Sequence, residues 1–462
     1  MQTLISLSMP LVLRCHVLKF PNCFRTSDQV RRGPSRSLFT PLTPRVPICH
    51  CLARPNPAST WKSWKHGRCL AGIVSVFASN ASFLNTVNLV ITGDDLDNQI
   101  DIVRQAGQVK IIARGDTLLH YDLDSTYNYG TVTPTYTEIT FDASRGMRDV
   151  TIQMFSGNDD VRISVIGNHR FGNLLVSLGE GNNSFLLMGS SSTSASNKNY
   201  VTFFSLDGGA GRDQIYVYKT AINGGTLNTG GGHDSVYLND ILSDRLSITL
   251  GAGNDTLLVH QLGLTSFSVD LGSGDDQATF TGNNTFGSFN SLYNTWVGGL
   301  TVLEGAGRDT LSFAGTTVVD NKLSIDLGAE PDRLFVAAAA NTTDPPTLKV
   351  DGPDGQINTT ILTGTGNDVV RFGTGSGSGK SVQFEVETRL NLGSGDDALY
   401  VRNAIFNLII ALLGDGNDKV LNNWGSSNVT VGSGSKLHGG PGIDVLPASW
   451  TTPTNLTVLA IP

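Results

Sequence analysis

The chain has 462 residues, of which 39% are hydrophobic and 16% are charged, with a formal net charge of −8. Residues 1–69 carry 11 Lys and Arg and one acid, Asp28, whereas residues 70–462 carry 21 Lys and Arg against 39 Asp and Glu. The net charges, +10 and −18, make the long segment strongly acidic. This argues against nucleic acid or anionic lipid as a partner, because both require basic patches. No apolar run approaches the roughly 20 residues of a membrane helix, so no transmembrane segment is expected.

The first part of the chain reads as a leader. In residues 1–60, Pro, Ser and Arg are scattered without apolar periodicity, which predicts disorder. Residues 61–81 then have the layout of a secretory signal peptide, with bases before an apolar stretch and small residues at its end. Cleavage would follow Ala81, and the protein would be secreted or displayed at the cell surface. For residues 1–60, an alternative is that the start site is assigned too far upstream. For residues 61–81, the alternative is a basic tail that leads into a first buried strand.

A short pattern recurs over residues 82–446, which we assign to one repeat domain. An apolar strand leads into Gly-x-Gly-x-Asp, and alternating apolar residues follow. The step from Asp213 to Asp234, Asp255 and Asp276 is 21 residues each time, and other steps range from 21 to 36. Residues 447–462, which contain three prolines, are expected to form a C-terminal cap.

The periodicity predicts the fold class. The second and fourth residues after each Asp are apolar, as in Ile215 and Val217, and a second alternating segment precedes each turn, as in Leu246 and Ile248. Each repeat therefore holds at least two short strands with one inward face. A two-stranded unit cannot bury that face alone, whereas stacked units form a continuous core. We expect an all-β protein, a parallel β-solenoid of the β-helix or β-roll type. A globular β-sandwich is the alternative, and the constant step of 21 argues against it.

The turns resemble the calcium-binding repeats of the RTX, or hemolysin-type, family, whose unit is GGxGxDxUx with U a large apolar residue. The double-Gly form stands at Gly208–Asp213 and again at Gly439–Asp444. The resemblance implies a parallel β-roll with Ca2+ held between stacked turns by Asp carboxylates and backbone carbonyls. Carried over to this sequence, the ligands are Asp213, Asp234, Asp255, Asp276, Asp309, Asp368, Asp397, Asp418 and Asp444.

Physical chemistry also favours a cation in these turns. In-register stacking would place the aspartates about 5 Å apart, where at an effective dielectric near 20 each neighbouring pair repels by ~3 kcal/mol. Calcium prefers six to eight hard oxygens, which carboxylates and a Gly-rich turn supply. Alternatively, each Asp caps its own turn by accepting backbone N–H bonds. Asn183 breaks the Asp column, and the turn at Ala329–Asp332 lacks its second Gly, so calcium is not assigned there.

The function expected from these features is an exported, calcium-stabilised structural or adhesive module that binds extracellular polymers, glycans or further copies of itself. The alternative is a polysaccharide-active enzyme, a lyase, epimerase or hydrolase, on the same scaffold. Its acid/base pair would be Glu385 and Glu387, beside Arg389 on one strand face. No catalytic residue is assigned. Outward aromatic residues after several turns, such as Tyr216 and Tyr237, could stack on sugar rings or on a partner protein.

Overall fold

A computed structural model describes most of the chain after residue 71. The described ranges are 72–81, 86–122, 135–143, 147–166, 170–189, 199–290, 295–352 and 357–461. The predicted leader, residues 1–60, and residues 61–71 of the predicted signal segment lie outside them. The chain divides into two units, Met1–Gly67 and Arg68–Pro462, and the described residues all belong to the second.

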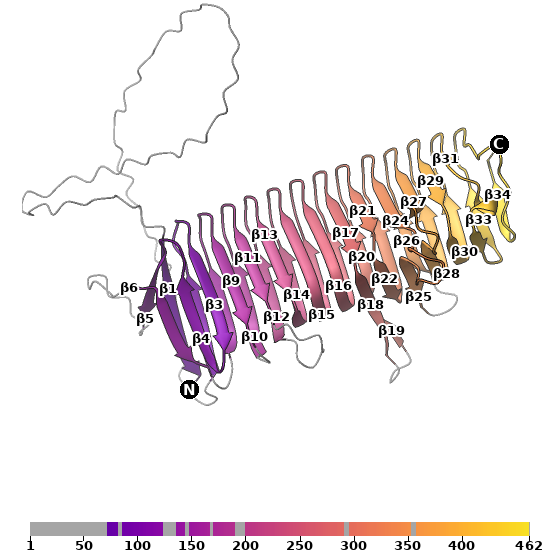
Figure 1. Cartoon of the computed structure of the whole chain (residues 1–462). Helices are drawn as coiled ribbons and strands as arrows, with labels where there is room; N and C mark the ends of the chain where they lie inside the picture. Colours follow the sequence, from indigo (N-terminus) through magenta and orange to yellow (C-terminus); the bar gives the residue numbers. More distant parts are fainter. Residues whose placement is uncertain are drawn as a thin grey trace, which may run out of the picture. The chain divides into compact units, whose positions relative to one another are not determined.

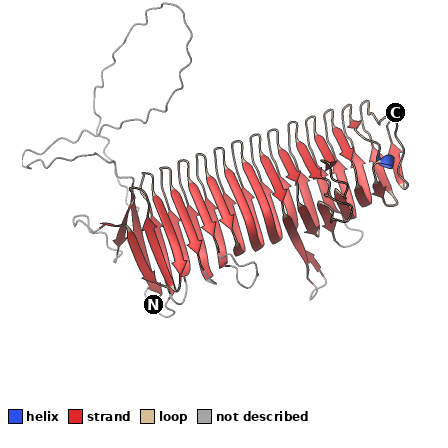
Figure 2. Ribbon diagram, viewed as in Figure 1, coloured by secondary structure: helices blue, strands red, loops and turns tan. Residues whose placement is uncertain are grey.

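This second unit is all-β, which confirms the predicted class. Its described residues form 34 strands and one short 3-10 helix, Trp424–Ser426. Most strand pairs are parallel, as predicted, and successive repeats lie side by side along the unit (Figure 1, Figure 2). Because each strand pairs with the equivalent strand of the next repeat, the strands fall into columns.

Three columns of parallel strands make up most of the unit. The post-turn column begins directly after the Gly-x-Gly-x-Asp turns, the pre-turn column ends at them, and the middle column lies between the two in sequence. The post-turn column contains β9 (Asp160–Val165), β11 (Ser184–Met188), β13 (Gln214–Tyr218), the first parts of β15 (Ser235–Thr249) and β16 (Thr256–Asp270), β17 (Gln277–Thr281), β21 (Thr310–Phe313), β24 (Arg333–Ala337), β27 (Val369–Thr374), β29 (Ala398–Val401) and β31 (Lys419–Val420).

The pre-turn column runs the length of the unit. It contains β2 (Thr86–Thr92), β8 (Met147–Gln153), β10 (Arg170–Ser177), β12 (Asn199–Asp207), β14 (Thr220–Asn228), the last parts of β15 and β16, β20 (Gly299–Leu303), β23 (Lys322–Asp326), β26 (Ile357–Leu362), the last parts of β28 (Val382–Asn391) and β30 (Ala404–Leu412), β33 (Ser435–His438) and β34 (Leu456–Leu459). Part of the predicted cap, β34, is thus a further strand of this column.

The middle column goes beyond the two strands per repeat that the sequence indicates. It contains the middle of β16, β18 (Asn283–Asn290), β22 (Thr316–Asp320), β25 (Leu348–Asp351), the first parts of β28 and β30, and β32 (Val429–Val431). β18 also forms an antiparallel hairpin with β19 (Thr295–Val297). The long steps of the repeat therefore supply strands as well as loops.

Antiparallel pairing is concentrated at the N-terminal end of the unit. There, β1 (Ile73–Ala81) pairs antiparallel with β2 and parallel with β5 (Leu118–Asp122). β4 (Gln108–Ala113) lies antiparallel to both β3 (Gln99–Gln105) and β7 (Glu138–Asp142), and β6 (Thr135–Tyr136) pairs antiparallel with β5. Val74 and Val76 of β1 are fully buried. The end of the predicted signal segment is thus part of a β-strand that buries Val74 and Val76.

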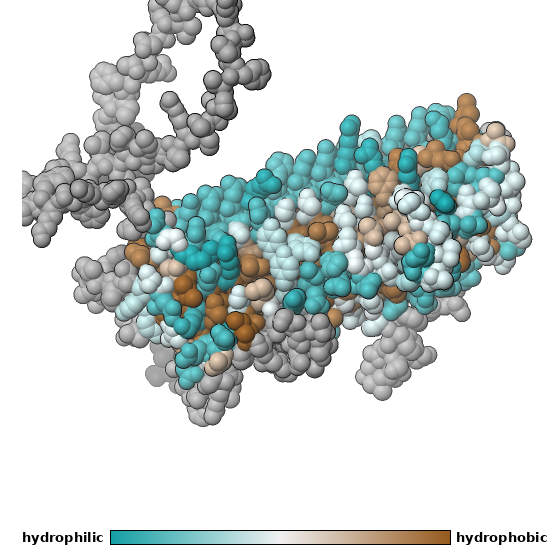
Figure 3. Space-filling view, in the orientation of Figure 1, coloured by the Kyte–Doolittle hydropathy of each residue, from teal (hydrophilic) through white to brown (hydrophobic). Residues whose placement is uncertain are grey.

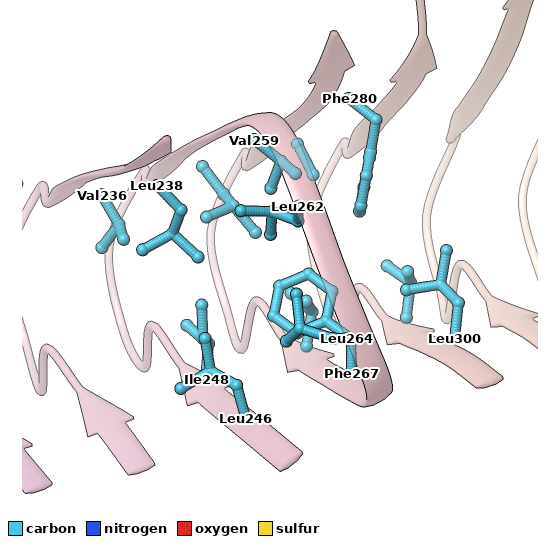
Figure 4. Packing of buried hydrophobic residues seen from close by; sticks show 14 of the residues in the cluster. Val236, Leu238, Leu246, Ile248, Val259, Leu262, Leu264, Phe267, Phe280 and Leu300 are labelled. Carbon is cyan, nitrogen blue, oxygen red and sulfur yellow. The ribbon is translucent and has the colours of Figure 1, made fainter. Parts of the chain in front are cut away.

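A single hydrophobic core runs between the columns. Val236 and Leu238 of the post-turn column point inward together with Leu246 and Ile248 of the pre-turn column (Figure 4). The 21-residue step keeps such residues in register, because Val236 pairs with Leu257 and Ile248 with Val269. Burying each such side chain stabilises the fold by ~1.5–3 kcal/mol. The alternating pattern thus sets both which face is buried and how the repeats stack.

Candidate functional site: a ladder of buried aspartates

Each Gly-x-Gly-x-Asp turn stacks closely on its neighbours. The Gly231 N–H donates to the Gly209 carbonyl at 3.0 Å, and the Gly232 N–H donates to the Ala252 carbonyl at 2.7 Å. Gly230 has φ +92°, and a Cβ placed on it would lie 1.8 Å from the Gly209 carbonyl oxygen. Only glycine accepts this conformation and this approach of two backbones. The repeated glycines are therefore required for the turns to stack.

The aspartates that end the turns form a continuous hydrogen-bonded ladder. The Asp213 N–H donates to Asp234 Oδ1 at 2.8 Å, and the Asp234 N–H donates to Asp255 Oδ1 at 2.7 Å. The same bond recurs from turn to turn until Asp418 donates to Asp444 Oδ1 at 3.1 Å. All nine predicted ligands lie in this column. Each Oδ1 serves the N–H of the preceding repeat, so the alternative of an Asp that caps only its own turn does not describe the bond.

The ladder is longer than the predicted set of residues. Asn98 donates to Asp159, Asp159 to Asn183 and Asn183 to Asp213, each through its backbone N–H. Asp332 also stands in the column, between Asp309 and Asp368. The two positions that depart from the motif, Asn183 and Asp332, thus keep the same bond. Sequence reasoning excluded Asp332 because its turn lacks a Gly, yet the column needs only the terminal Asp.

The second carboxylate oxygen of each ladder aspartate is buried without a hydrogen-bond partner. This holds for eleven side chains in the described residues, all at most 3% exposed: Asp159, Asp213, Asp234, Asp255, Asp276, Asp309, Asp332, Asp368, Asp397, Asp418 and Asp444. A buried polar atom without a partner costs ~1–3 kcal/mol. The repetition of this cost along the whole column indicates that Oδ2 has a partner of another kind.

The asparagines in the column show what Oδ2 faces. Asn183 Nδ2 donates to the carbonyls of Gly179 at 3.2 Å and Gly181 at 3.3 Å, and Asn98 Nδ2 donates to the Leu96 carbonyl at 2.7 Å. At an aspartate position, an oxygen takes the place of this amide nitrogen. By this analogy, we expect the aspartate Oδ2 to face turn carbonyl oxygens with no hydrogen between them. Such a contact is favourable only if the carboxyl is protonated or if a cation lies among the oxygens.

Burial raises the pKa of the ladder carboxyls from Asp159 to Asp418 above the usual value for Asp. Loss of hydration is the largest cause, the bond from the preceding N–H opposes it, and neighbouring carboxylates raise the pKa further. The pKa of Asp276 rises to about 7, and that of Asp397 to about 8. For Asp255 and Asp309 the pKa rises to about 6. Near neutral pH the ladder therefore takes up protons unless a cation compensates the charge.

The oxygens along the ladder suit calcium in their chemistry. A Ca2+ ion would take Oδ2 of a ladder aspartate and the turn carbonyls that Asn183 Nδ2 contacts in its own turn. Backbone carbonyls would supply much of the coordination, because no three His, Cys, Asp or Glu side chains in the described ranges converge as a metal site. Calcium at the nine predicted aspartates therefore remains a prediction.

One buried acid beside the ladder was missed from the sequence. Glu304 occupies the position five residues before a ladder aspartate, where neighbouring repeats have Leu271 and Leu327. It is 0% exposed, and neither carboxylate oxygen has a hydrogen-bond partner. Burial, and then the charges of Asp309, Asp332 and Asp276, raise its pKa well above the usual value for Glu. The only sequence signal was an acid at a position that is otherwise apolar or small.

A second ladder runs along the exposed side of the turns in the opposite sense. Its acceptors stand one residue before the ladder aspartates. The Asp275 N–H donates to Asn254 Oδ1 at 3.3 Å, and the Arg308 N–H donates to Asp275 Oδ1 at 3.0 Å. Here each acceptor belongs to the preceding repeat, whereas the buried ladder takes its acceptor from the following repeat. Each turn is thus tied to both neighbours.

The alternative catalytic pair lies on β28. Glu385 and Glu387 are both half-buried on the side of the strand opposite the fully buried Val386. Gln383 Nε2 donates to Glu385, and Arg389 Nε donates to Glu387 Oε1 at 3.2 Å. The structure thus places the two carboxylates on one face, as predicted, and gives each a polar partner two residues away on its own strand.

Comparisons with known proteins add no relative. No protein-family model, curated protein or solved structure matches the chain. In the part of the chain that the structure describes, no helix is both long and apolar enough to cross a membrane.

Proposed function

We propose that the chain is an exported β-solenoid, stabilised by calcium along its aspartate ladder, that acts as a structural or adhesive module outside the cell or at its surface. The observation that carries the proposal is the column of buried aspartates whose Oδ2 atoms lack a partner. Extracellular modules bind calcium with dissociation constants of about 10⁻⁴–10⁻³ M, a range that suits exposure to extracellular calcium. Residues 70–462 contain no Cys, so a cation ladder would take the place of disulfides.

The stacked parallel strands support the structural part of the proposal. They form long, regular faces, and the edge along which the turns project is mostly hydrophilic (Figure 3). A repeat array of this kind gains surface with every repeat, which suits binding to polymers or assembly with further copies. The RTX-like turns support calcium as the cation, and extracellular polymers or glycans as partners follow from the proposed location.

Thermal unfolding of the full chain tests the proposal. We expect 10 mM Ca2+ to raise the midpoint and equimolar Mg2+ to leave it near the value in chelator, because a ligand of the folded state stabilises it by about 1.4 kcal/mol per site at ten times Kd. Magnesium is the control because it demands a smaller octahedral site. Coincident melts in calcium and in chelator would overturn calcium binding.

The enzymatic alternative has its own test. Glu385 and Glu387 share one face of β28 next to Arg389, an arrangement that suits acid/base chemistry on a sugar chain. Turnover of a uronic-acid polymer by the full chain, lost in Glu385→Gln or Glu387→Gln, would favour the enzyme. Binding of the polymer without turnover would favour the structural and adhesive function.

A further inference from the structure

Over ten consecutive strands, one face of this acidic unit carries no carboxylate. No outward position of the post-turn column holds Asp or Glu in any strand from β11 to β31. In the long strands β15 and β16, the post-turn column ends at Asn239 and His260. The pre-turn column, by contrast, presents Asp270 and Asp326 outward. Residues 70–462 contain 39 acids, so an acid-free face across ten strands is a distinct surface.

The third residue after each ladder Asp or Asn points outward, and these residues form a line that we call the outer row. Parallel register places Leu186, Tyr216, Tyr237 and Leu258 side by side, and it continues through Thr279 and Ser312 to Phe335, Arg371 and Tyr400. At ~4.8 Å per strand the row is roughly 40 Å long. Its length suits an extended polymer better than a small ligand.

The N-terminal part of the outer row is an aromatic platform. Tyr216 and Tyr218 lie with ring centroids 6.2 Å apart and planes at 8°, and Tyr237 meets Tyr218 edge-on at 5.2 Å. A groove of about 600 Å³ runs beside them, lined also by Met188 and Arg162. Arg162 pairs with Asp160 at 2.8 Å, a carboxylate that Arg114 also contacts at 2.8 Å. Aromatic faces are electron-rich and attract the C–H groups on the flat face of a sugar ring.

The C-terminal part of the outer row is cationic. Arg371 lies between Phe335 and Tyr400 in the row and is exposed. Arg333 and Lys419 are exposed in the adjacent outward line of the same column, which also holds Val369 and Ala398. Acids of the turns, such as Asp396, belong to the turn edge and not to this face. Three cations next to two aromatic rings form a surface complementary to a polyanion.

From this combination we infer that the outer row binds an extended anionic polysaccharide, a chain of uronic-acid or sulfated sugars. Its sugar rings stack on Tyr216, Tyr237 and Phe335, and its acidic groups contact Arg333, Arg371 and Lys419. The hydroxyls of Thr279 and Ser312, in the middle of the row, hydrogen-bond sugar hydroxyls. This inference deepens the proposed extracellular function, on which it rests for access to such polymers.

Binding of polygalacturonate to the full chain tests the inference. The double variant Arg333→Gln/Arg371→Gln should weaken binding about tenfold and reduce its salt dependence, because charge-assisted contacts are lost. The control is Lys322→Gln/Lys436→Gln, which removes the same charge from exposed positions of the pre-turn column. It should change the affinity less than about twofold, a surface effect of under ~0.5 kcal/mol.

A second pair of variants tests the stacking. Tyr216→Ala/Tyr237→Ala should weaken polygalacturonate binding several-fold, whereas Phe203→Ala, an aromatic 41% exposed on the pre-turn strand β12, should not. Unchanged thermal midpoints show that the variants are folded. Neutral dextran should bind more weakly than polygalacturonate, and single-stranded DNA should not displace it.

Four results would overturn the inference: no binding of polygalacturonate, equal loss in either control, equal affinity for dextran, or tighter binding of the DNA. The effect of calcium on the thermal midpoint is interpreted separately from these binding measurements. Calcium stabilisation without polymer binding refutes the outer row alone, and polymer binding without calcium stabilisation refutes the calcium ladder alone.

Discussion

The two carboxylate oxygens of Asp255 have opposite surroundings. Oδ1 accepts the Asp234 N–H at 2.7 Å, and Oδ2 is buried without a partner. Asp255→Ala removes the acceptor and should lower stability by ~1–3 kcal/mol, because it leaves a buried N–H unsatisfied. Asp255→Asn keeps the acceptor and adds an amide that can donate to turn carbonyls, as Asn183 does. In chelator we expect it to be at least as stable as the parent.

The same pair of variants also tests whether Asp255 Oδ2 holds a proton or contacts a cation. If Asp255 Oδ2 binds calcium, Asp255→Asn gains less than the parent when calcium is added to a denaturant titration. An equal gain in both proteins would remove Asp255 from the set of ligands.

The ladder also predicts how stability depends on pH without calcium. An unfolded Asp has a pKa of about 3.9, whereas burial raises the folded pKa of Asp213 to about 7 and that of Asp332 to about 8. The folded state therefore binds more protons between about pH 4 and pH 8, so stability falls as pH rises through this window. Thermal midpoints in chelator should decline from pH 5 to pH 8, and calcium should lessen the decline. Midpoints that rise over this range would contradict the ladder's raised pKa values.

A further prediction concerns how the buried acid Glu304 affects stability. Glu304→Leu restores the residue found at the equivalent positions 271 and 327, and it removes a buried acid with two unpartnered oxygens. We expect it to raise stability in chelator by ~1–3 kcal/mol. Glu330→Gln, at an exposed turn position, is the charge-matched control. A loss of stability in Glu304→Leu would show that Glu304 serves the fold through an interaction that the neighbouring leucines do not make.

Among the structural elements, the Gly-x-Gly-x-Asp turn is the most sensitive to substitution. A Cβ at Gly230 would lie 1.8 Å from the Gly209 carbonyl oxygen, whereas one at Gly231 has nothing closer than 4.0 Å. Gly230→Ala should therefore cost at least ~2 kcal/mol, and Gly231→Ala should be neutral or stabilising by up to ~1 kcal/mol. Ala already stands at the equivalent position 252. Urea unfolding of the two variants provides the comparison, and equal stabilities would refute the stacking requirement.

Strands with strict alternation were predictable from the sequence. Ile215 and Val217, or Leu246 and Ile248, leave little doubt about which face is buried, and the 21-residue step sets the register. The middle column was not predictable because its first pairings involve only short segments, such as Ile241–Ser243 of β15 against Leu262–Leu264 of β16. On β16 only Gly263 and Leu264 pair with β18, and two residues show no period.

The candidate site was predictable in its residues but not in its bonds. The repeated Asp placed the ladder in one column, but no spacing reveals that Oδ1 accepts an N–H from the preceding repeat. That bond depends on how far each turn is offset from the next. Glu304 was not predicted as a buried acid because its burial follows from its stacking on neighbouring repeats, which have Leu271 and Leu327 at this position, and not from its own surroundings in sequence.

On the scale of the whole unit, the N-terminal boundary can be tested. Cleavage after Ala81 would remove β1, which pairs with β2 and β5 and buries Val74 and Val76. A chain that begins at residue 82 should therefore melt at a lower temperature than one that begins at residue 61, because each valine contributes about 1.5–3 kcal/mol. Equal midpoints would show that β1 adds nothing to the fold. Mass spectrometry of exported protein would then show which end the cell uses.

The two ladders have opposite directions at the turn that ends at Asp276: the Asp276 N–H takes its acceptor from the following repeat, and the Asp275 N–H takes one from the preceding repeat. Between Asp213 and Asp276 the step never changes, and a 21-residue unit could be lost or duplicated while every junction keeps the bond of the buried ladder. The gene can therefore alter the reach of the molecule by whole units, at about 4.8 Å each, without new packing. The length of such a protein can therefore change during evolution in steps of one repeat.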